Sequence, residues 1–120
     1  MAMHKVAIVC GGRDYNDKDY AFCFLNENLP ECLVLIEGGA TGADRLGRLW
    51  AQSRGIHVAT VNAQWGRYGK AAGPYRNVAM LRLRPDVVVA FPGGNGTNHM
   101  RDAARRDGIQ LIIASGVQDA

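Results

Sequence analysis

Long hydrophobic runs are missing from this sequence of 120 residues. No apolar stretch approaches the ~18 residues that a transmembrane helix requires. The first residues also lack the apolar run of a secretory signal peptide. These absences count against a membrane-spanning or secreted protein, and we expect a cytoplasmic protein without a membrane partner.

Cysteine is scarce and odd in number, with Cys10, Cys23 and Cys32 all in apolar surroundings. A disulfide framework is therefore not expected, and we predict three buried thiols in a reducing compartment. The cysteine spacing fits no zinc pattern, and the three histidines stand apart from one another. The sequence thus predicts no metal site, and nothing in it implies a cofactor.

The excess of positive charge is small, with a formal net charge of +3 and a pI of about 9.0. The cationic group Arg101, Arg105 and Arg106 is interrupted by Asp102 and Asp107, as on a solvated helix face. This balance suits an anionic small ligand and is too weak to indicate a nucleic-acid surface. We therefore expect a nucleotide-type small molecule as the partner, and no nucleic acid.

What the sequence does contain is a regular alternation of two patterns. Short, nearly continuous apolar runs alternate with segments of helical periodicity, which is typical of buried parallel strands joined by helices. The predicted strands are residues 6–10, 32–36, 58–61, 87–91 and 111–113. The order βαβαβαβαβ predicts one Rossmann-like α/β domain over residues 1–120, with three α/β/α layers and a five-stranded parallel sheet of order 3-2-1-4-5.

Helix starts can be predicted from polar side chains that precede the periodic segments. Asp17 is the expected cap of the first helix, and either Thr41 or Asp44 that of the second. Thr97 or Asn98 is the expected cap of the fourth helix. Between the third strand and the third helix the sequence predicts a long irregular segment.

Glycine is abundant, with 15 residues, and about half of them fall in three clusters. Each cluster follows a predicted strand, so all three should lie at the carboxyl edge of the sheet, where such folds bind ligands between the first and fourth strands. Glycines that precede a helix start leave backbone amides free to hold an anion. The turn after the fourth strand is accordingly the predicted phosphate-binding turn, formed by Pro92, Gly93, Gly94, Asn95, Gly96 and Thr97.

The turn after the first strand contributes Gly11, Gly12, Arg13 and Asp14 to the predicted site. The guanidinium of Arg13 is suited to bind phosphate oxygens in a forked arrangement. The alternative is a surface ion pair with a neighbouring aspartate.

The turn after the second strand begins with Glu37, Gly38 and Gly39. Dinucleotide-binding domains place an acid at this point on the ribose hydroxyls, so Glu37 is a candidate ligand residue. Its alternative role is to cap the following turn. Asp44 belongs to the same candidate set, although its position favours a helix-start residue over a ligand contact.

The segment 62–77 adds aromatic and cationic residues at the same edge of the sheet. Such residues suit base stacking and phosphate capture. The alternative is that Trp65 and Tyr68 pack the segment onto the body of the domain, and we expect this of Trp65. Arg76 and Asn77 are the candidates for ligand binding, with Arg76 directed at phosphate.

Four motifs resemble the YspA-like, cpYpsA-related branch of the SLOG superfamily. They are VCGGRDY at 9–15, EGGATGADR at 37–45, GKAAGPYRN at 69–77 and AFPGGNGT at 90–97. The resemblance implies a Rossmann-like fold that binds a nucleotide or a nucleotide derivative, including NAD-derived or cyclic signals, as a sensor or sequestering domain. It also implies a homo-oligomer, for which Trp50 or Tyr20 would be interface residues unless they belong to the core.

Two relatives within the superfamily supply alternative functions. Lonely-guy phosphoribohydrolases cleave nucleoside 5′-monophosphates, and Arg76 matches their catalytic arginine, whereas Met100 occupies the position of their glutamate. A thioether cannot transfer a proton, so hydrolysis would require another acid, with Glu37 as a candidate and Asp14 or Asp102 as further ones. The catalytic residues of such an enzyme are otherwise unknown from the sequence. DprA-like proteins imply single-stranded nucleic-acid binding as the second alternative.

Overall fold

A single parallel sheet organises the chain in a computed structural model that describes residues 4–115. Its strand order is β3-β2-β1-β4-β5, which confirms the predicted order and the α/β class. The elements are β1 (Val6–Cys10), α1 (Lys18–Asn28), β2 (Val34–Glu37), α2 (Ala43–Ser53), β3 (His57–Thr60), α3 (Trp65–Tyr68), the 3-10 turn η1 (Gly69–Ala71), α4 (Ala72–Leu81), β4 (Val87–Ala90), α5 (Asn95–Arg106) and β5 (Gln110–Ile113).

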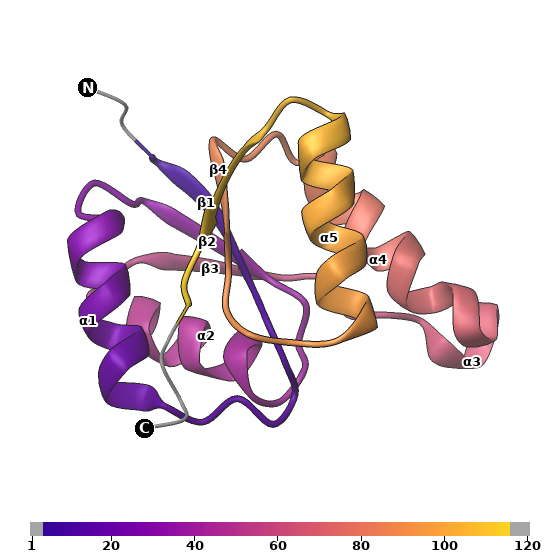
Figure 1. The fold of residues 1–120 in the computed structure, drawn as a ribbon, viewed down its shortest axis with the longest axis horizontal. Helices are drawn as coiled ribbons and strands as arrows, with labels where there is room; N and C mark the ends of the chain where they lie inside the picture. The colour runs from indigo at the N-terminus through magenta and orange to yellow at the C-terminus, as the bar shows by residue number, and fades with distance from the viewer. Residues whose placement is uncertain (1–3, 116–120) are drawn as a thin grey trace.

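Helices cover both faces of the sheet and form three layers (Figure 1). Successive β1 side chains alternate between the layers: Ala7 and Val9 pack with α1 and α2, whereas Ile8 and Cys10 pack with α4 and α5. Side chains buried on both faces explain why the strands are continuous apolar runs in the sequence. Trp50 is completely buried in the first of these cores, so the structure assigns it to packing and not to an exposed interface.

The helix starts differ from prediction in α2. Helix α1 begins as predicted, because the Asp17 carboxylate accepts a hydrogen bond from the Tyr20 amide at 3.1 Å. Helix α2 follows Gly42, whose φ of +75° is a conformation that glycine adopts without steric cost. The prediction that Thr41 or Asp44 caps α2 is therefore wrong, since no side-chain cap bond forms there.

Helix α5 also begins earlier than its predicted caps. Its first residue is Asn95 and its N-cap is Gly94, so neither Thr97 nor Asn98 is the cap. Glycine is a poor helix former, which is why the pattern of the sequence places this start too late. The consequence is that half of the predicted glycine turn belongs to the first turn of a helix.

The segment after β3 is more ordered than predicted. It contains α3 and η1, and a positive φ of +56° at Gly69 separates the two. Each is a single turn, too short to produce a periodic apolar pattern in the sequence. Together with the start of α4 these turns form an arm that protrudes from the layered body (Figure 1).

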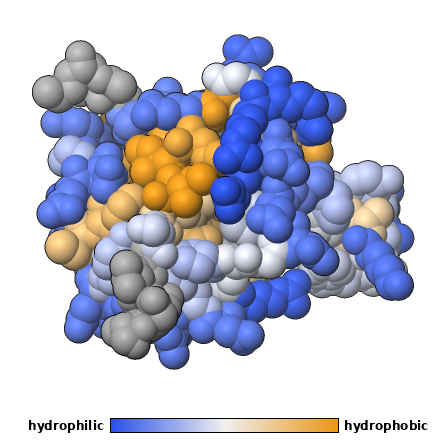
Figure 2. Space-filling view, in the orientation of Figure 1, coloured by the Kyte–Doolittle hydropathy of each residue, from blue (hydrophilic) through white to orange (hydrophobic). Residues whose placement is uncertain are grey.

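The face of the molecule seen in Figure 2 is mostly polar and carries one apolar patch. The exposed Ile113 of edge strand β5 contributes apolar surface. Cys23 is also exposed, which corrects the expectation of three buried thiols, because it faces away from the sheet on α1. No helix of the described chain combines the length and the apolar character needed to cross a bilayer.

Candidate functional site

The turns that follow β1 and β4 meet at the carboxyl edge of the sheet. The amide of Gly12 donates a hydrogen bond to the carbonyl of Pro92 at 2.8 Å. A Cβ added to Gly93 would lie only 2.7 Å from the Gly12 nitrogen, so the two backbones require a residue without a side chain. The convergence of these turns, predicted from the strand order, is confirmed.

A cavity of about 470 Å³ lies at this edge, and most of the predicted ligand residues line it. These are Gly11, Gly12, Arg13, Gly38, Asp44, Arg76, Asn77, Gly94, Asn95, Gly96 and Thr97. A second hollow of about 330 Å³ adjoins it, shares Arg13, Gly38 and Arg76 with it, and includes Gly39. Of the remaining predicted residues, Asp14, Glu37, Pro92 and Gly93 line neither hollow.

The N-terminus of α5 presents unpaired amides to the larger cavity. The first hydrogen bond within the helix runs from the Asn98 amide to the Gly94 carbonyl at 2.9 Å. The amides of Asn95, Gly96 and Thr97 therefore have no acceptor within the helix. No atom lies within 4 Å of a Cβ added to Gly94 or Gly96, so this end of the helix is open. The helix dipole adds a positive potential at the same place.

Three cationic side chains line the same cavity, namely Arg13, Lys70 and Arg76. Arg76 is held rigidly, because its Nη1 donates to the Gly38 carbonyl at 2.7 Å. A Cβ at position 38 would lie 2.5 Å from that Nη1, so the glycine makes this approach possible. Together with the α5 amides, these cations make the cavity suited to an anion.

Asp44 is a buried carboxylate at the cavity wall. Its Oδ2 accepts hydrogen bonds from the amides of Gly38 at 3.1 Å and Ala40 at 3.3 Å, which shapes the turn after β2. Burial raises the pKa of Asp44 above its ordinary value of 3.8, while the two amides and the nearby Arg76 oppose that rise. Asp44 thus stabilises the turn after β2 instead of capping helix α2, and its side chain also borders the cavity.

Glu37 does not reach the cavity. Its side chain is completely buried, and its carboxylate accepts from the Gly39 amide at 2.6 Å and from the Thr60 hydroxyl. Arg48 lies 3.5 Å away as a partly exposed ion-pair partner. Of the two roles that the sequence left open for Glu37, the structure supports the capping of the turn, because its oxygens accept hydrogen bonds from Gly39 and Thr60. Asp14 also lies outside both hollows, but unlike Glu37 it is exposed.

Further residues outside the predicted binding set line the cavity, and of these the sequence analysis missed His99. Trp65, expected to pack the segment down, is 48% exposed at the mouth of both hollows, with the Arg13 guanidinium 5.4 Å from its ring centre. Lys70 and His99 also line the cavity. His99 lies three residues after Gly96 and four after Asn95, and this spacing, which places residues on one face of a helix, is the signal that could have identified it. Within residues 4–115, no three metal-binding side chains are grouped so that they could hold an ion.

Comparison with known proteins identifies the family. The family model described as "YspA, cpYpsA-related SLOG family" matches residues 5–68, which include the first two glycine turns. The chain belongs to this family. The Gene 61 protein of Mycobacterium phage D29 is 36% identical over 115 residues, covering 88% of this chain and 92% of that protein.

The fold of this SLOG protein is also found in a larger solved structure. The X-ray structure of DNA processing protein A (DprA) from Streptococcus pneumoniae superposes with a TM-score of 0.69 at 18% identity. The match covers 98% of this chain and 52% of DprA, so the chain spans about half the length of that relative. At this identity the likeness shows the shared fold alone.

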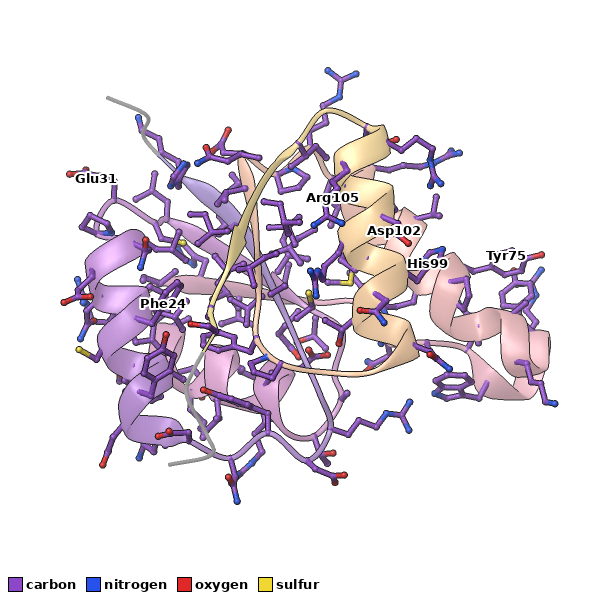
Figure 3. All side chains as sticks on the ribbon, in the orientation of Figure 1. Phe24, Glu31, Tyr75, His99, Asp102 and Arg105 are labelled. Carbon is purple, nitrogen blue, oxygen red and sulfur yellow. The ribbon has the colours of Figure 1, made fainter. Side chains whose placement is uncertain are left out.

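Met100, which the resemblance to lonely-guy enzymes aligns with their glutamate, lies in the core of the domain. The side chain of Met100 is completely buried among Ile8, Met80 and their neighbours, and it does not line the cavity. Asp102 is exposed, and its carboxylate lies 3.5 Å from Arg105 on the same helix (Figure 3). Among the described residues, Asp44 supplies the carboxylate at the wall of the larger cavity.

Proposed function

We propose that this chain binds a phosphorylated nucleotide or nucleotide derivative in the larger cavity and leaves it unchanged, as a sensor or sequestering domain. The observation that carries the proposal is the juxtaposition of the open α5 N-terminus with Arg13, Lys70 and Arg76 around one cavity. Backbone amides, a helix dipole and guanidinium groups are the usual partners of a phosphate.

The aromatic lining supports a nucleotide in preference to a simple anion. Trp65 offers a half-exposed ring at the cavity mouth, and base stacking on such a ring contributes about 1–3 kcal/mol. A volume of about 470 Å³ lies within the usual range for small-molecule sites.

The distribution of acids supports binding without hydrolysis. Enzymes that hydrolyse glycosidic bonds typically use carboxyl groups that flank the scissile bond. Met100 and Glu37 are both completely buried, and neither lines the cavity. Asp44 is a lining carboxylate, but two backbone amides already hold one of its oxygens.

Mass spectrometry of the small molecules released on denaturing the purified protein tests this proposal. A parallel sample is incubated with a panel of nucleotides before analysis. We expect an intact nucleotide derivative to be released and no panel member to be converted. Appearance of free base and ribose phosphate would instead establish a hydrolase, and Asp44→Asn would then be the variant that separates true turnover from a contaminating activity.

Single-stranded nucleic-acid binding is a second candidate, favoured by the composition of the protruding arm. Trp65, Tyr68 and Tyr75 are 48%, 38% and 55% exposed there, and Tyr75 lies at its outer part (Figure 3). The Arg67 guanidinium lies 5.0 Å from the Tyr68 ring centre. Exposed aromatic rings interleaved with cations are typical of single-strand binding. Fluorescence anisotropy with a labelled oligonucleotide should then show an affinity that falls steeply with salt, and no binding would exclude this candidate.

A further inference from the structure

A chain of side-chain hydrogen bonds connects the turn after β2 to helix α5 through α4. Arg76 donates through Nη1 to the Gly38 carbonyl at 2.7 Å and through Nε to Asn77 Oδ1 at 3.1 Å. Asn77 Nδ2 lies 3.2 Å from the Gly96 carbonyl and 3.1 Å from His99 Nδ1. All five residues line the larger cavity, so the network forms part of its wall.

The orientation of the Asn77 amide is fixed from two sides. The Nε of Arg76 can only donate, so the atom that faces it must be the amide oxygen. The carbonyl of Gly96 can only accept, so the atom that faces it must be the amide nitrogen. Asn77 is only 5% exposed. An inverted amide would bury one donor facing the Nε donor of Arg76 and one acceptor facing the Gly96 carbonyl, which is unfavourable.

This orientation determines where His99 carries its proton. One hydrogen of Asn77 Nδ2 is directed at the Gly96 carbonyl, and the other is available to His99 Nδ1. Nδ1 must therefore present a lone pair, which leaves the proton of the neutral ring on Nε2. In a doubly protonated ring, the hydrogen on His99 Nδ1 would face the hydrogen on Asn77 Nδ2, and no hydrogen bond could form between them. Asn77 is thus a positioning residue for the imidazole.

We propose that His99 is held as an uncharged Nε2–H donor that binds a neutral acceptor of the ligand, such as an oxygen or nitrogen of the ribose or the base. The inference rests on the proposed function and divides the cavity by chemistry. The phosphate is bound by the α5 amides and by Arg13 and Lys70, whereas the α5 wall one turn further along offers a donor without charge. Figure 3 places His99 on α5, on the side toward α4.

Nitrogen-15 NMR of the imidazole rings tests the state of His99 without any ligand. The unchanged protein should show the Nε2–H tautomer for His99. Asn77→Asp replaces the amide donor by an acceptor and should move the proton to Nδ1. Asn77→Ala removes the donor without adding charge and should release the ring into exchange between tautomers, which keeps the test valid if a buried carboxylate prevents folding. His57, exposed on β3, serves as the internal control and should not change.

Two outcomes of that experiment would overturn the proposal. One is an Nδ1–H or doubly protonated His99 ring in the unchanged protein at neutral pH. The other is a His99 tautomer that is the same in the unchanged protein and in every folded Asn77 variant, because Asn77 would then not select it.

Calorimetry with AMP and with inorganic phosphate tests what His99 binds. His99→Phe should raise the Kd for AMP about tenfold, since it removes one hydrogen bond to a desolvated acceptor. His99→Gln retains an N–H donor near the Nε2 position and should restore most of that affinity. Phosphate affinity should be the same in both variants, and His57→Phe should change neither value. Unchanged AMP affinity in His99→Phe, or an equal loss for phosphate, would overturn the assignment. If the unchanged protein binds neither probe, the proposed function fails, and the imidazole spectrum still decides the state of His99.

Discussion

Replacement of Gly94 by aspartate should have opposite effects on stability and on binding. No atom lies within 4 Å of a Cβ at this position, and its φ is −107°, so a side chain fits without a clash. Gly94 is the N-cap of α5, where an aspartate adds a few tenths of a kcal/mol through its cap bond and about 0.5 kcal/mol through the helix dipole. We expect Gly94→Asp to unfold slightly above the unchanged protein, by about 3 °C.

The same carboxylate would compete with a phosphate for the α5 amides. Two unit charges ~4 Å apart near a protein surface repel each other by about 4 kcal/mol at an effective dielectric constant of ~20. AMP affinity should therefore fall about a thousandfold in Gly94→Asp. Gly94→Asn is the matched control, because it has the same shape and a cap oxygen but no charge, and it should bind AMP within a few-fold of the unchanged protein.

Isothermal calorimetry with AMP and with adenosine, together with thermal unfolding, measures both effects. The loss should be confined to AMP, since adenosine has no phosphate to repel. An aspartate variant that binds AMP as tightly as the asparagine variant would refute the placement of a phosphate at the α5 N-terminus. Loss of the folded state would show instead that Gly94 has a structural role that its open surroundings do not reveal.

Three further measurements test the architecture around the cavity. Gly42→Ala should lower the free energy of unfolding in urea by about 3 kcal/mol, because Gly42 has a φ of +75° and a Cβ there would overlap the turn after β1. Gly55→Ala is the control: its φ is +70° but its surroundings are open, so the loss should be only about 1 kcal/mol. Burial raises the pKa of Asp44, so the contribution of this carboxyl group to stability is complete below pH 3.8 and is lost as the pH rises through its folded-state pKa. Asp44→Asn should therefore be more stable than the unchanged protein at neutral pH only. A thiol reagent should label exposed Cys23 rapidly but Cys10 only after unfolding, because burial raises the pKa of the Cys10 thiol to about 12.

The sheet could be predicted from the sequence because its strands are buried on both faces. β1 has the predicted bounds, 6–10, whereas β2 begins at Val34 and not at residue 32. Cys32 is apolar enough to extend the hydrophobic run, but hydropathy does not reveal where the backbone pairing begins. The right-handed crossover rule predicts a parallel, doubly wound sheet from the alternation of elements alone. The order 3-2-1-4-5 is the usual one for such sheets, and the alternation by itself does not distinguish it from 2-1-3-4-5.

The site could be predicted only as far as backbone position determines it. Glycine clusters after strands identify the sheet edge, and the cavity forms where the turns after β1 and β4 meet. The direction in which a side chain points could not be predicted in the same way. Glu37 and Asp44 border the same turn, yet Glu37 is directed to Thr60 and Arg48 while Asp44 borders the cavity. No one-dimensional pattern distinguishes these two orientations.

On helix α5, the adjacent residues His99 and Met100 have different roles: His99 lines the cavity, and Met100 packs in the core. Successive helical residues differ in direction by about 100°, so His99 and Met100 cannot share one environment. Met100 contributes to the core, and a carboxylate in its place would be buried among apolar side chains, at a cost in free energy. His99, one residue earlier, borders the cavity and contacts Asn77. In this chain the helix therefore places an imidazole at the cavity wall, where it is the hydrogen-bond donor that the proposed binding function uses.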